Sequence, residues 1–283
     1  MNKMKNIKVA IQGVAGSFHE LAASDYFQHK DPDLLYCDSF EQLFKLVSDE
    51  KECFGVVAIE NTVAGSILPN YKMLQEYNFS VIGEIYMRIV QNLMVLPGQQ
   101  LSDIKEIWSH PMALKQCSDF LKKHSNIKSV IREDTAKSAE IIKNNDLKHV
   151  AAIAGEKAAN IYGLEIIKKE IETNKKNFTR FLVISSNTEI VLEKINKASI
   201  CFTLDHETGS LAKVLVLLSE NNLNLTKVQS NPIVGKEWEY FFYVDLLFDS
   251  YDNYKRTMDD LNDIATELLI LGEYTSGEKP VIN

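Results

Sequence analysis

Residues 7–29 read IKVAIQGVAGSFHELAASDYFQH, which is the sequence pattern of one complete strand, turn and helix. Residues 7–12 are largely apolar and β-branched and predict a buried strand. A turn with two glycines follows at residues 13–17, where Ser17 and Glu20 form the S-x-x-E capping box that begins a helix. We therefore expect a helix over residues 18–29, directly after the strand.

The same unit recurs along the first two thirds of the chain. Apolar runs at residues 56–59, 107–108, 129–131 and 150–154 each lead into a polar or glycine turn, and residues 69–77 have helical spacing. Alternating strands and helices indicate an α/β fold with a largely parallel sheet, whose ligand sites lie beyond the strand ends. The turns are therefore the expected place for a binding site.

A different pattern begins near residue 197, after a charged stretch at residues 168–176, a strand at 182–185 and a bridge over 189–196. Strands are predicted at residues 198–204, 223–228, 239–248 and 268–274, with helices at 211–221 and 251–267. The resulting order βαββαβ predicts a small ferredoxin-like unit. We expect two domains, one over residues 1–188 and one over residues 197–283.

The composition is that of an ordinary globular protein, with 45% hydrophobic and 25% charged residues among 283. A net charge of −8 argues against nucleic acid or an anionic membrane as partner, because both require a broad basic face. The scattered residues Cys37, Cys53, Cys117 and Cys201 predict reduced core thiols rather than a zinc or redox pair. Because no secretory signal or membrane-spanning run is recognisable, the expected location is the cytoplasm.

Two polar turns are candidate ligand sites. The turn of Gly13, Gly16 and Ser17 lacks the lysine of a P-loop and the third glycine of a dinucleotide fingerprint, which disfavours nucleotide binding. Its helix N-terminus can hold a carboxylate, although a tight capped turn is the purely structural alternative. The second turn follows Glu60 and contains Asn61, Thr62, Gly65 and Ser66. Neighbouring strand ends would aim both sets of donors into one crevice.

Other polar residues point less directly to chemistry. Arg180 is one of only four arginines, and its guanidinium suits a carboxylate partner, although a surface or structural role is the alternative. His110, before Pro111, is more typical of a strand-to-helix junction than of a catalytic base. No Ser/His/Asp triad, metal cluster or close acidic pair is recognisable. A site would have to work with hydroxyls, amides and a cation.

Five stretches, taken in order, carry a family resemblance. They are QGVAGSFHELAA at residues 12–23, GVVAIENTVAGSI at 55–67, SHPMALKQC at 109–117, DTAKSA at 134–139 and NFTRFLVI at 177–184. In this order, and with the consecutive Thr179, Arg180 and Phe181, the chain resembles the prephenate dehydratases over nearly its whole length.

The resemblance implies a periplasmic-binding-protein-like catalytic domain with two α/β lobes, one near residues 1–85 plus 178–188 and the other between them. It implies a lyase of phenylalanine biosynthesis that turns prephenate into phenylpyruvate without metal or cofactor. Thr179 would donate to the leaving hydroxyl, Arg180 would bind a substrate carboxylate and Phe181 would form a wall against the ring. Further donors would come from Ser17, Asn61, Thr62, Gly65, Ser66 and Thr135.

The C-terminal unit resembles an ACT domain, which implies feedback inhibition by phenylalanine and assembly as a homodimer or homotetramer. The effector residues implied are Gly209, Ser210, Leu211 and Ala212, together with Gln229, Ser230, Asn231 and Pro232. The last four stand where the family carries Glu, Ser, Arg and Pro, which weakens the regulatory inference. A chain ending near Asn187 would keep some activity and lose the response to phenylalanine.

The chain also departs from the family at Val14, His19, Ala58 and Thr62, and it has Gln91 where histidine is common. Two alternatives stay open. The first is arogenate dehydratase, which would act on the aminated substrate. The second is a non-catalytic sensor of small molecules, because both folds bind ligands without chemistry.

Overall fold

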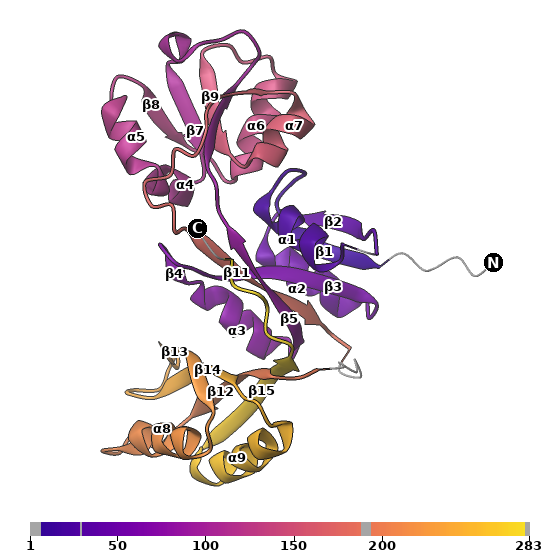
Figure 1. The fold of residues 1–283 in the computed structure, drawn as a ribbon, viewed down its shortest axis with the longest axis vertical. Coiled ribbons are helices and arrows are strands. Elements are labelled where there is room, and N and C mark those ends of the chain that lie inside the picture. Colours follow the sequence, from indigo (N-terminus) through magenta and orange to yellow (C-terminus); the bar gives the residue numbers. More distant parts are fainter. Residues whose placement is uncertain (1–6, 29, 188–193, 281–283) are drawn as a thin grey trace, which may run out of the picture.

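A computed structural model describes residues 7–28, 30–187 and 194–280, and it contains three sheets (Figure 1). The predicted helix end at residue 29 and part of the predicted bridge at residues 189–196 lie outside the described residues. Within the described ranges, no helix is both long and apolar enough to cross a bilayer. The four cysteines are buried and free of disulfide bonds, as predicted.

The first sheet and its helices form the first lobe. Its strands are β1 (Lys8–Gln12), β2 (Asp33–Cys37), β3 (Cys53–Asn61), β4 (Gly65–Ser66), β5 (Ser80–Arg88) and β11 (Phe178–Ser185). The order is β2-β1-β3-β11-β5, with β4 paired to β3. Its helices are α1 (Phe18–Tyr26), α2 (Phe40–Asp49) and α3 (Leu68–Glu76).

The second lobe is formed by the segment between β5 and β11. Its strands are β6 (Asn92–Val95), β7 (Glu106–Ser109), β8 (Lys128–Ile131), β9 (Val150–Ala154) and β10 (Glu165–Lys168), in the order β10-β6-β9-β7-β8. Its helices are η1 (Leu101–Asp103), α4 (Pro111–Gln116), α5 (Ser118–Lys123), α6 (Thr135–Asn144) and α7 (Glu156–Tyr162). After the second lobe, the chain returns to the sheet of the first lobe as β11.

The C-terminal domain has the predicted βαββαβ order. It contains β12 (Lys197–Thr203), α8 (Ser210–Glu220), β13 (Asn224–Pro232), β14 (Tyr240–Leu247), α9 (Tyr251–Ile264) and β15 (Glu267–Tyr274). The sheet order is β13-β14-β12-β15, and all pairs are antiparallel. The ferredoxin-like prediction is therefore confirmed.

The C-terminal sheet is covered on both faces. One face packs on α8 and α9 through a core that includes Val214, Val244 and Leu261. The other face joins the core of the first lobe, where the rings of Tyr71 and Tyr243 lie 4.9 Å apart. Alternate residues of a strand face opposite sides, so β12, β14 and β15 contribute to both cores.

Two features differ from the sequence-based expectations. The sheets are mixed rather than largely parallel, because β11 runs antiparallel to both β3 and β5, and β6 antiparallel to β9 and β10. In addition, β11 begins at Phe178 and not at residue 182. Thr179, Arg180 and Phe181 therefore lie inside a strand, where successive side chains must face opposite sides.

Candidate active site

Thr179 and Asn61 form the centre of the candidate site. They are Cα partners on the antiparallel strands β11 and β3, and Asn61 Nδ2 donates to Thr179 Oγ1 at 2.9 Å. Thr179 is 8% exposed and Asn61 is 7% exposed. A hydroxyl held in so dry an environment has few competing water molecules around it, which strengthens its hydrogen bonds.

The orientation of the Asn61 amide is fixed by the chain that follows it. Asn61 Oδ1 accepts from the backbone N–H groups of Val63 and Ala64 at 2.9 and 3.0 Å. The nitrogen of the side chain must therefore face Thr179 and act as donor. Because Thr179 Oγ1 accepts this bond, its own proton remains to be donated elsewhere.

A chain of amides runs from this pair into the second lobe. Asn177 Oδ1 accepts from Asn61 Nδ2 at 2.8 Å and from Gln116 Nε2 at 3.4 Å, and Gln91 Nε2 donates to Gln116 Oε1 at 3.3 Å. Gln91 Oε1 is buried and has no hydrogen-bond partner among the residues that the structure describes. A buried acceptor in this position can receive a bond from water or a bound molecule.

Asn177 and Gln116 were not predicted as site residues. Both stand inside stretches that the sequence analysis identified, beside Thr179 and before Cys117, respectively. Their amides could have been noticed there, but only the fold brings the two stretches into contact.

The glycine turn lies where the two lobes meet. Ser17 Oγ accepts from Glu20 N at 3.2 Å, and Glu20 Oε2 accepts from Gly16 N at 2.6 Å, so the predicted cap is present with Gly16 as the second donor. Gly16 has φ +86°, and a Cβ there would lie 2.7 Å from Ala158 Cα of α7. Only glycine permits this close approach of the second lobe.

Thr135 begins α6 of the second lobe, after the N-cap Asp134. A Cβ at Gly13 would lie 3.3 Å from Asp134 Oδ2, so the start of α6 faces the glycine turn. Lys157 of α7 reaches Glu20 of α1 at 2.8 Å. The glycine turn that contains Ser17 and the start of α6, where Thr135 lies, thus face each other from different lobes.

The second polar turn contacts both the start of β11 and the C-terminal domain. Thr62 Oγ1 accepts from Phe178 N and donates to Lys176 O, both at 2.9 Å, so its proton is committed to the backbone. Gly65 has φ +84° and allows the chain to return as β4. Ser66 Oγ accepts from Lys227 Nζ at 2.7 Å, and Lys227 belongs to the C-terminal domain.

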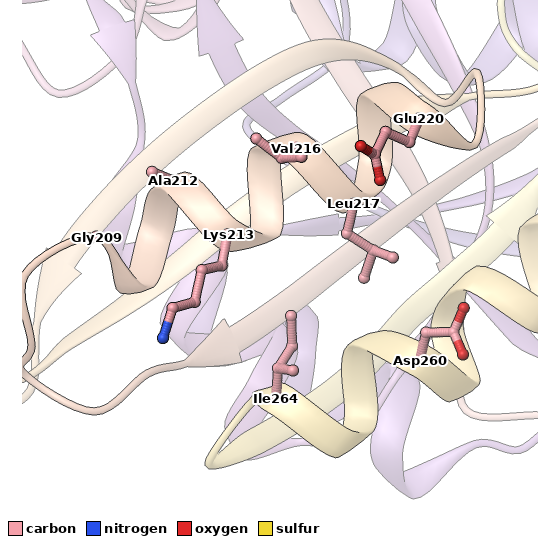
Figure 2. A pocket seen from close by; sticks show the side chains of 8 residues that line it. All are labelled: Gly209, Ala212, Lys213, Val216, Leu217, Glu220, Asp260 and Ile264. Carbon is pink, nitrogen blue, oxygen red and sulfur yellow. The ribbon is translucent and has the colours of Figure 1, made fainter.

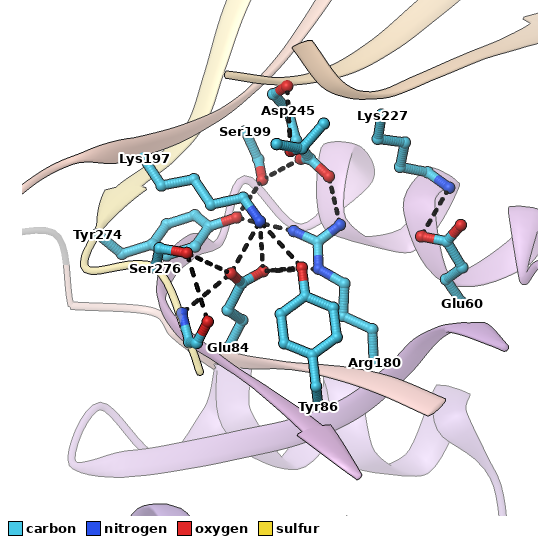
Figure 3. Close-up of polar contacts among 12 residues, drawn as sticks. Glu60, Glu84, Tyr86, Arg180, Lys197, Ser199, Lys227, Asp245, Tyr274 and Ser276 are labelled. Carbon is cyan, nitrogen blue, oxygen red and sulfur yellow. Dashed lines mark hydrogen bonds and ion pairs between the residues drawn. The ribbon is translucent and has the colours of Figure 1, made fainter. Parts of the chain in front are cut away.

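Arg180 lies elsewhere than expected. Its side chain is on the face of β11 opposite to Thr179, where Nε donates to Glu84 Oε2 at 2.7 Å, one terminal nitrogen pairs with Asp245, and the other donates to Tyr274 Oη at 2.9 Å (Figure 3). Burial alone would lower the pKa of the guanidinium, but the charge of Asp245 raises it. The predicted contact with a substrate carboxylate is therefore corrected to an interdomain role, because every nitrogen is already bonded within the protein.

Phe181 is 1% exposed and packs inside the first lobe rather than forming an open wall. The His19 ring meets it edge-on at 5.0 Å, and His19 Nε2 accepts from Ala58 N at 3.3 Å. Burial lowers the pKa of His19 to about 4, so this ring is neutral at pH 7. Phe181 therefore supports the strand beneath Thr179 from within the core.

His110 behaves as the sequence indicated. It is the N-cap of α4, and its Nδ1 accepts from Met112 N at 3.2 Å. Burial lowers its pKa, while the charge of Asp134 opposes this effect. A ring nitrogen committed to a helix cap favours the junction role over that of a base.

Comparison with known proteins places this geometry in a family. The family profile described as prephenate dehydratase matches residues 9–189, which is more than half of the chain. The chain belongs to the prephenate dehydratase family. Arogenate dehydratase/prephenate dehydratase 2 of Arabidopsis thaliana is 33% identical over 279 residues, covering 95% of this chain and 72% of the relative. The bifunctional chorismate mutase/prephenate dehydratase of Buchnera aphidicola is 34% identical, with 97% and 72% covered.

Solved structures show the same fold. Prephenate dehydratase of Arthrobacter aurescens in complex with L-Phe has a TM-score of 0.85 at 25% identity, covering 95% of this chain and 90% of that one. A protein described as a novel type of quorum-quenching acylase has a TM-score of 0.84 at 26% identity, covering 95% and 98%. One fold thus carries two described activities, which is why function must be argued from the site.

In this member of the prephenate dehydratase family, the predicted effector residues near α8 separate into two groups. Ser210 and Leu211 line a pocket of about 110 Å³ together with Trp238, Tyr240 and Phe242. Gly209 and Ala212 instead line a groove of about 660 Å³ between α8 and α9, where Leu217 and Ile264 project toward each other (Figure 2).

The second group of predicted effector residues lies on β13 and alternates between its faces. Ser230 and Pro232 are Cα partners of Phe242 and Tyr240, which line the smaller pocket. Gln229 is the partner of Tyr243 on the opposite face, and Gln229 Oε1 accepts from Ser66 Oγ at 3.1 Å. Asn231, two residues further along the strand, lies on the same face as Gln229. This strand therefore contacts both the candidate effector pocket and the second polar turn.

Proposed function

We propose that this protein converts prephenate to phenylpyruvate, carbon dioxide and water, with Thr179 as the residue that acts on the leaving hydroxyl. The observation that carries this proposal is the buried pair of Asn61 and Thr179, in a chain of the prephenate dehydratase family. The pair supplies an oriented hydroxyl proton. That proton is what departure of a ring hydroxyl as water requires.

The reaction balances with one proton. The ring C–O bond breaks with its electron pair on oxygen, and the oxygen leaves as water after taking the Thr179 proton. The C–C bond to the ring carboxylate breaks, carbon dioxide leaves, and the electrons of that bond complete the aromatic ring. Thr179 regains its proton from solvent, so one proton is consumed for each turnover.

A threonine hydroxyl is a poor acid in water, and its environment must compensate. The N–H of Asn61 stabilises negative charge that develops on Thr179 Oγ1 during proton transfer. Exclusion of water strengthens this interaction and protects the carboxylate that is being lost. The amide chain through Asn177 and Gln116 keeps the donor in place before the substrate arrives.

The dianionic substrate is bound mainly by hydrogen-bond donors. The N-terminus of α1 at Ser17 and the N-terminal residue Thr135 of α6 face the junction of the lobes, where aligned amides favour a carboxylate. The Asn61 side chain supports the second turn, with Gly65 shaping its backbone. Thr62 and Ser66 serve by holding this turn rather than by direct donation.

Phenylalanine binds in the C-terminal domain and lowers the activity. The pocket beside Ser210 and Leu211 offers the N-terminus of α8 for its carboxylate and the rings of Tyr240 and Phe242 for its side chain. The related structure from Arthrobacter aurescens is described in complex with L-Phe, which supports this assignment. The cytoplasmic location and the dimeric or tetrameric assembly stay predictions from the sequence.

The decisive experiment compares prephenate and arogenate as substrates of the full chain, each with and without phenylalanine. We expect phenylpyruvate from prephenate at the higher kcat/KM, and a lower rate when phenylalanine is added. Preferential formation of phenylalanine from arogenate would instead assign the protein to the activity named for the Arabidopsis relative. A chain that turns over neither substrate would be a sensor or, if it cleaves acyl amides, an acylase.

A further inference from the structure

The strands that carry Asn61 and Thr179 also carry a charged pair on their opposite face. Glu60 and Arg180 are Cα partners, one position along from the partners Asn61 and Thr179. Because successive side chains of a strand face opposite sides, the two pairs stand back to back. A shift of one pair must move the other through the shared backbone.

The C-terminal sheet presents a second charged pair to Glu60 and Arg180. Lys227 on β13 and Asp245 on β14 are Cα partners. Lys227 Nζ lies 3.1 Å from Glu60 Oε2, and the Arg180 guanidinium pairs with Asp245 (Figure 3). We call these two ion pairs the interdomain bridges. An ion pair thus joins β3 to β13, and a second ion pair joins β11 to β14.

The environment of the bridges makes them rigid. The side chains of Arg180, Asp245 and Lys227 are 4%, 3% and 7% exposed, whereas that of Glu60 is 37% exposed. Each buried charge has further partners: Glu84 accepts from Arg180 and from Lys197 at 2.7 and 2.8 Å, and Ser199 Oγ donates to Asp245 at 2.5 Å. A buried charge cannot leave its partner without a large penalty, so the bridges hold one geometry.

Lys227 also holds the chain on the far side of Asn61. Its ammonium donates to Ser66 Oγ at 2.7 Å as well as contacting Glu60. One cation therefore fixes the residue before Asn61 and the end of the turn after it. The position of the Asn61 amide, which orients the Thr179 hydroxyl, depends on both.

We propose that Lys227 and Asp245 of the C-terminal domain are positioning residues for Thr179, acting through Glu60 and Arg180. This inference rests on the catalytic role proposed for Thr179. Movement of β13 and β14 changes the alignment of the Thr179 proton while leaving the donors to the substrate carboxylates in place. The effect appears in kcat rather than in KM, because the alignment matters in the transition state.

The same strand gives a ligand a route to Thr179. Ser230 and Pro232 share a face with residues of the pocket beside α8, whereas Lys227 and Gln229 face the catalytic lobe. A molecule that displaces β13 from the pocket side changes the two bridges on the other side. The C-terminal domain is thereby part of the machinery that aligns Thr179, even in the absence of an effector.

The test uses full-length variants and prephenate turnover. Lys227→Met keeps the length of the side chain and removes its charge, and the partly exposed Glu60 can then be solvated, so folding is expected to survive. We expect kcat to fall by roughly ten- to a hundredfold, the range expected from a small misplacement of a catalytic group, with KM nearly unchanged. Lys227→Arg should recover most of kcat. Lys72→Met, which breaks the exposed pair of Lys72 and Glu76, is the matched control and should be unaffected.

The double variant with Thr179→Ala separates this proposal from the function on which it rests. If Lys227 acts through Thr179, Lys227→Met lowers kcat no further once the threonine hydroxyl is gone. An equal further loss in that background, or an unchanged kcat of Lys227→Met alone, overturns the positioning role. An unchanged kcat of Thr179→Ala alone would instead overturn the proposed catalytic role. Glu60→Gln repeats the comparison from the exposed side of the bridge if Lys227→Met does not fold.

Discussion

Asn61 and Thr179 are joined by a hydrogen bond whose direction is fixed: Asn61 Nδ2 donates, and Thr179 Oγ1 accepts at 2.9 Å. The direction follows from the two backbone N–H groups that occupy Asn61 Oδ1. The consequence is chemical, because an accepting hydroxyl still has its proton to give. An amide in the opposite orientation would draw that proton toward itself.

Removing the Thr179 hydroxyl should stop most of the chemistry. For Thr179→Ala we expect kcat to fall by about 10²- to 10⁴-fold, the usual contribution of one positioned general acid, with a smaller change in KM. Thr179→Ser keeps the hydroxyl but loses the β-branch that restricts its rotamers, so an intermediate kcat is expected. Steady-state rates of phenylpyruvate formation give both values. Near-normal turnover of Thr179→Ala would remove this residue from the mechanism.

Reversing the polarity of the hydrogen bond between Asn61 and Thr179 should also lower kcat. In Asn61→Asp, a carboxylate oxygen replaces the donor nitrogen and accepts the Thr179 proton. We expect kcat to fall by at least about tenfold, since the general-acid contribution of the hydroxyl is lost in part. The test measures kcat of Asn61→Asp and of wild type. Thermal unfolding of both proteins checks that the variant is folded. Equal kcat in Asn61→Asp and wild type would contradict the assigned direction.

Separating the two domains should destabilise the catalytic part. The sequence suggested that a chain ending near Asn187 keeps some activity, but Tyr71, Phe79 and Val81 pack in one core with residues of the C-terminal sheet. Truncation exposes this apolar surface and removes Asp245 from Arg180, so we expect aggregation and a lower Tm. Size-exclusion chromatography and thermal unfolding, with the full chain as control, measure both. A monodisperse fragment with an unchanged Tm would refute this expectation.

The partly buried His19 should make stability depend on pH. Burial lowers its folded-state pKa to about 4 from the ordinary 6.5, so the unfolded chain binds more protons as the pH falls through this window. Stability is therefore lost between pH 6.5 and 4, and this residue contributes about 2 kcal/mol of that loss by pH 4.5. Urea unfolding gives the free energy of unfolding at pH 7 and at pH 4.5. The difference between these two values should be smaller for His19→Gln than for wild type. The glutamine amide can still accept from Ala58 N. Identical pH dependence in the two proteins would exclude His19 as the cause.

Much of the fold was predictable from local patterns. The βαββαβ unit and the start of α1 at Ser17 follow from strand periodicity and from a capping pattern of four residues. The extension of β11 to Phe178 was missed, because Thr179 and Arg180 interrupt the apolar pattern before residue 182. Tertiary contacts with β3 and β5 overrode that local preference.

The sequence by itself determined the candidate site residues, since Thr179, Asn61 and the two glycine-containing turns can all be recognised in short stretches of chain. Only the tertiary structure decided which of them act together. Thr179 and Arg180 are neighbours in sequence, yet the alternation of a strand sends one toward Asn61 and the other toward Asp245 of another domain. Local sequence specifies where strands and turns form. What each face of a strand packs against depends on contacts between residues far apart in the chain.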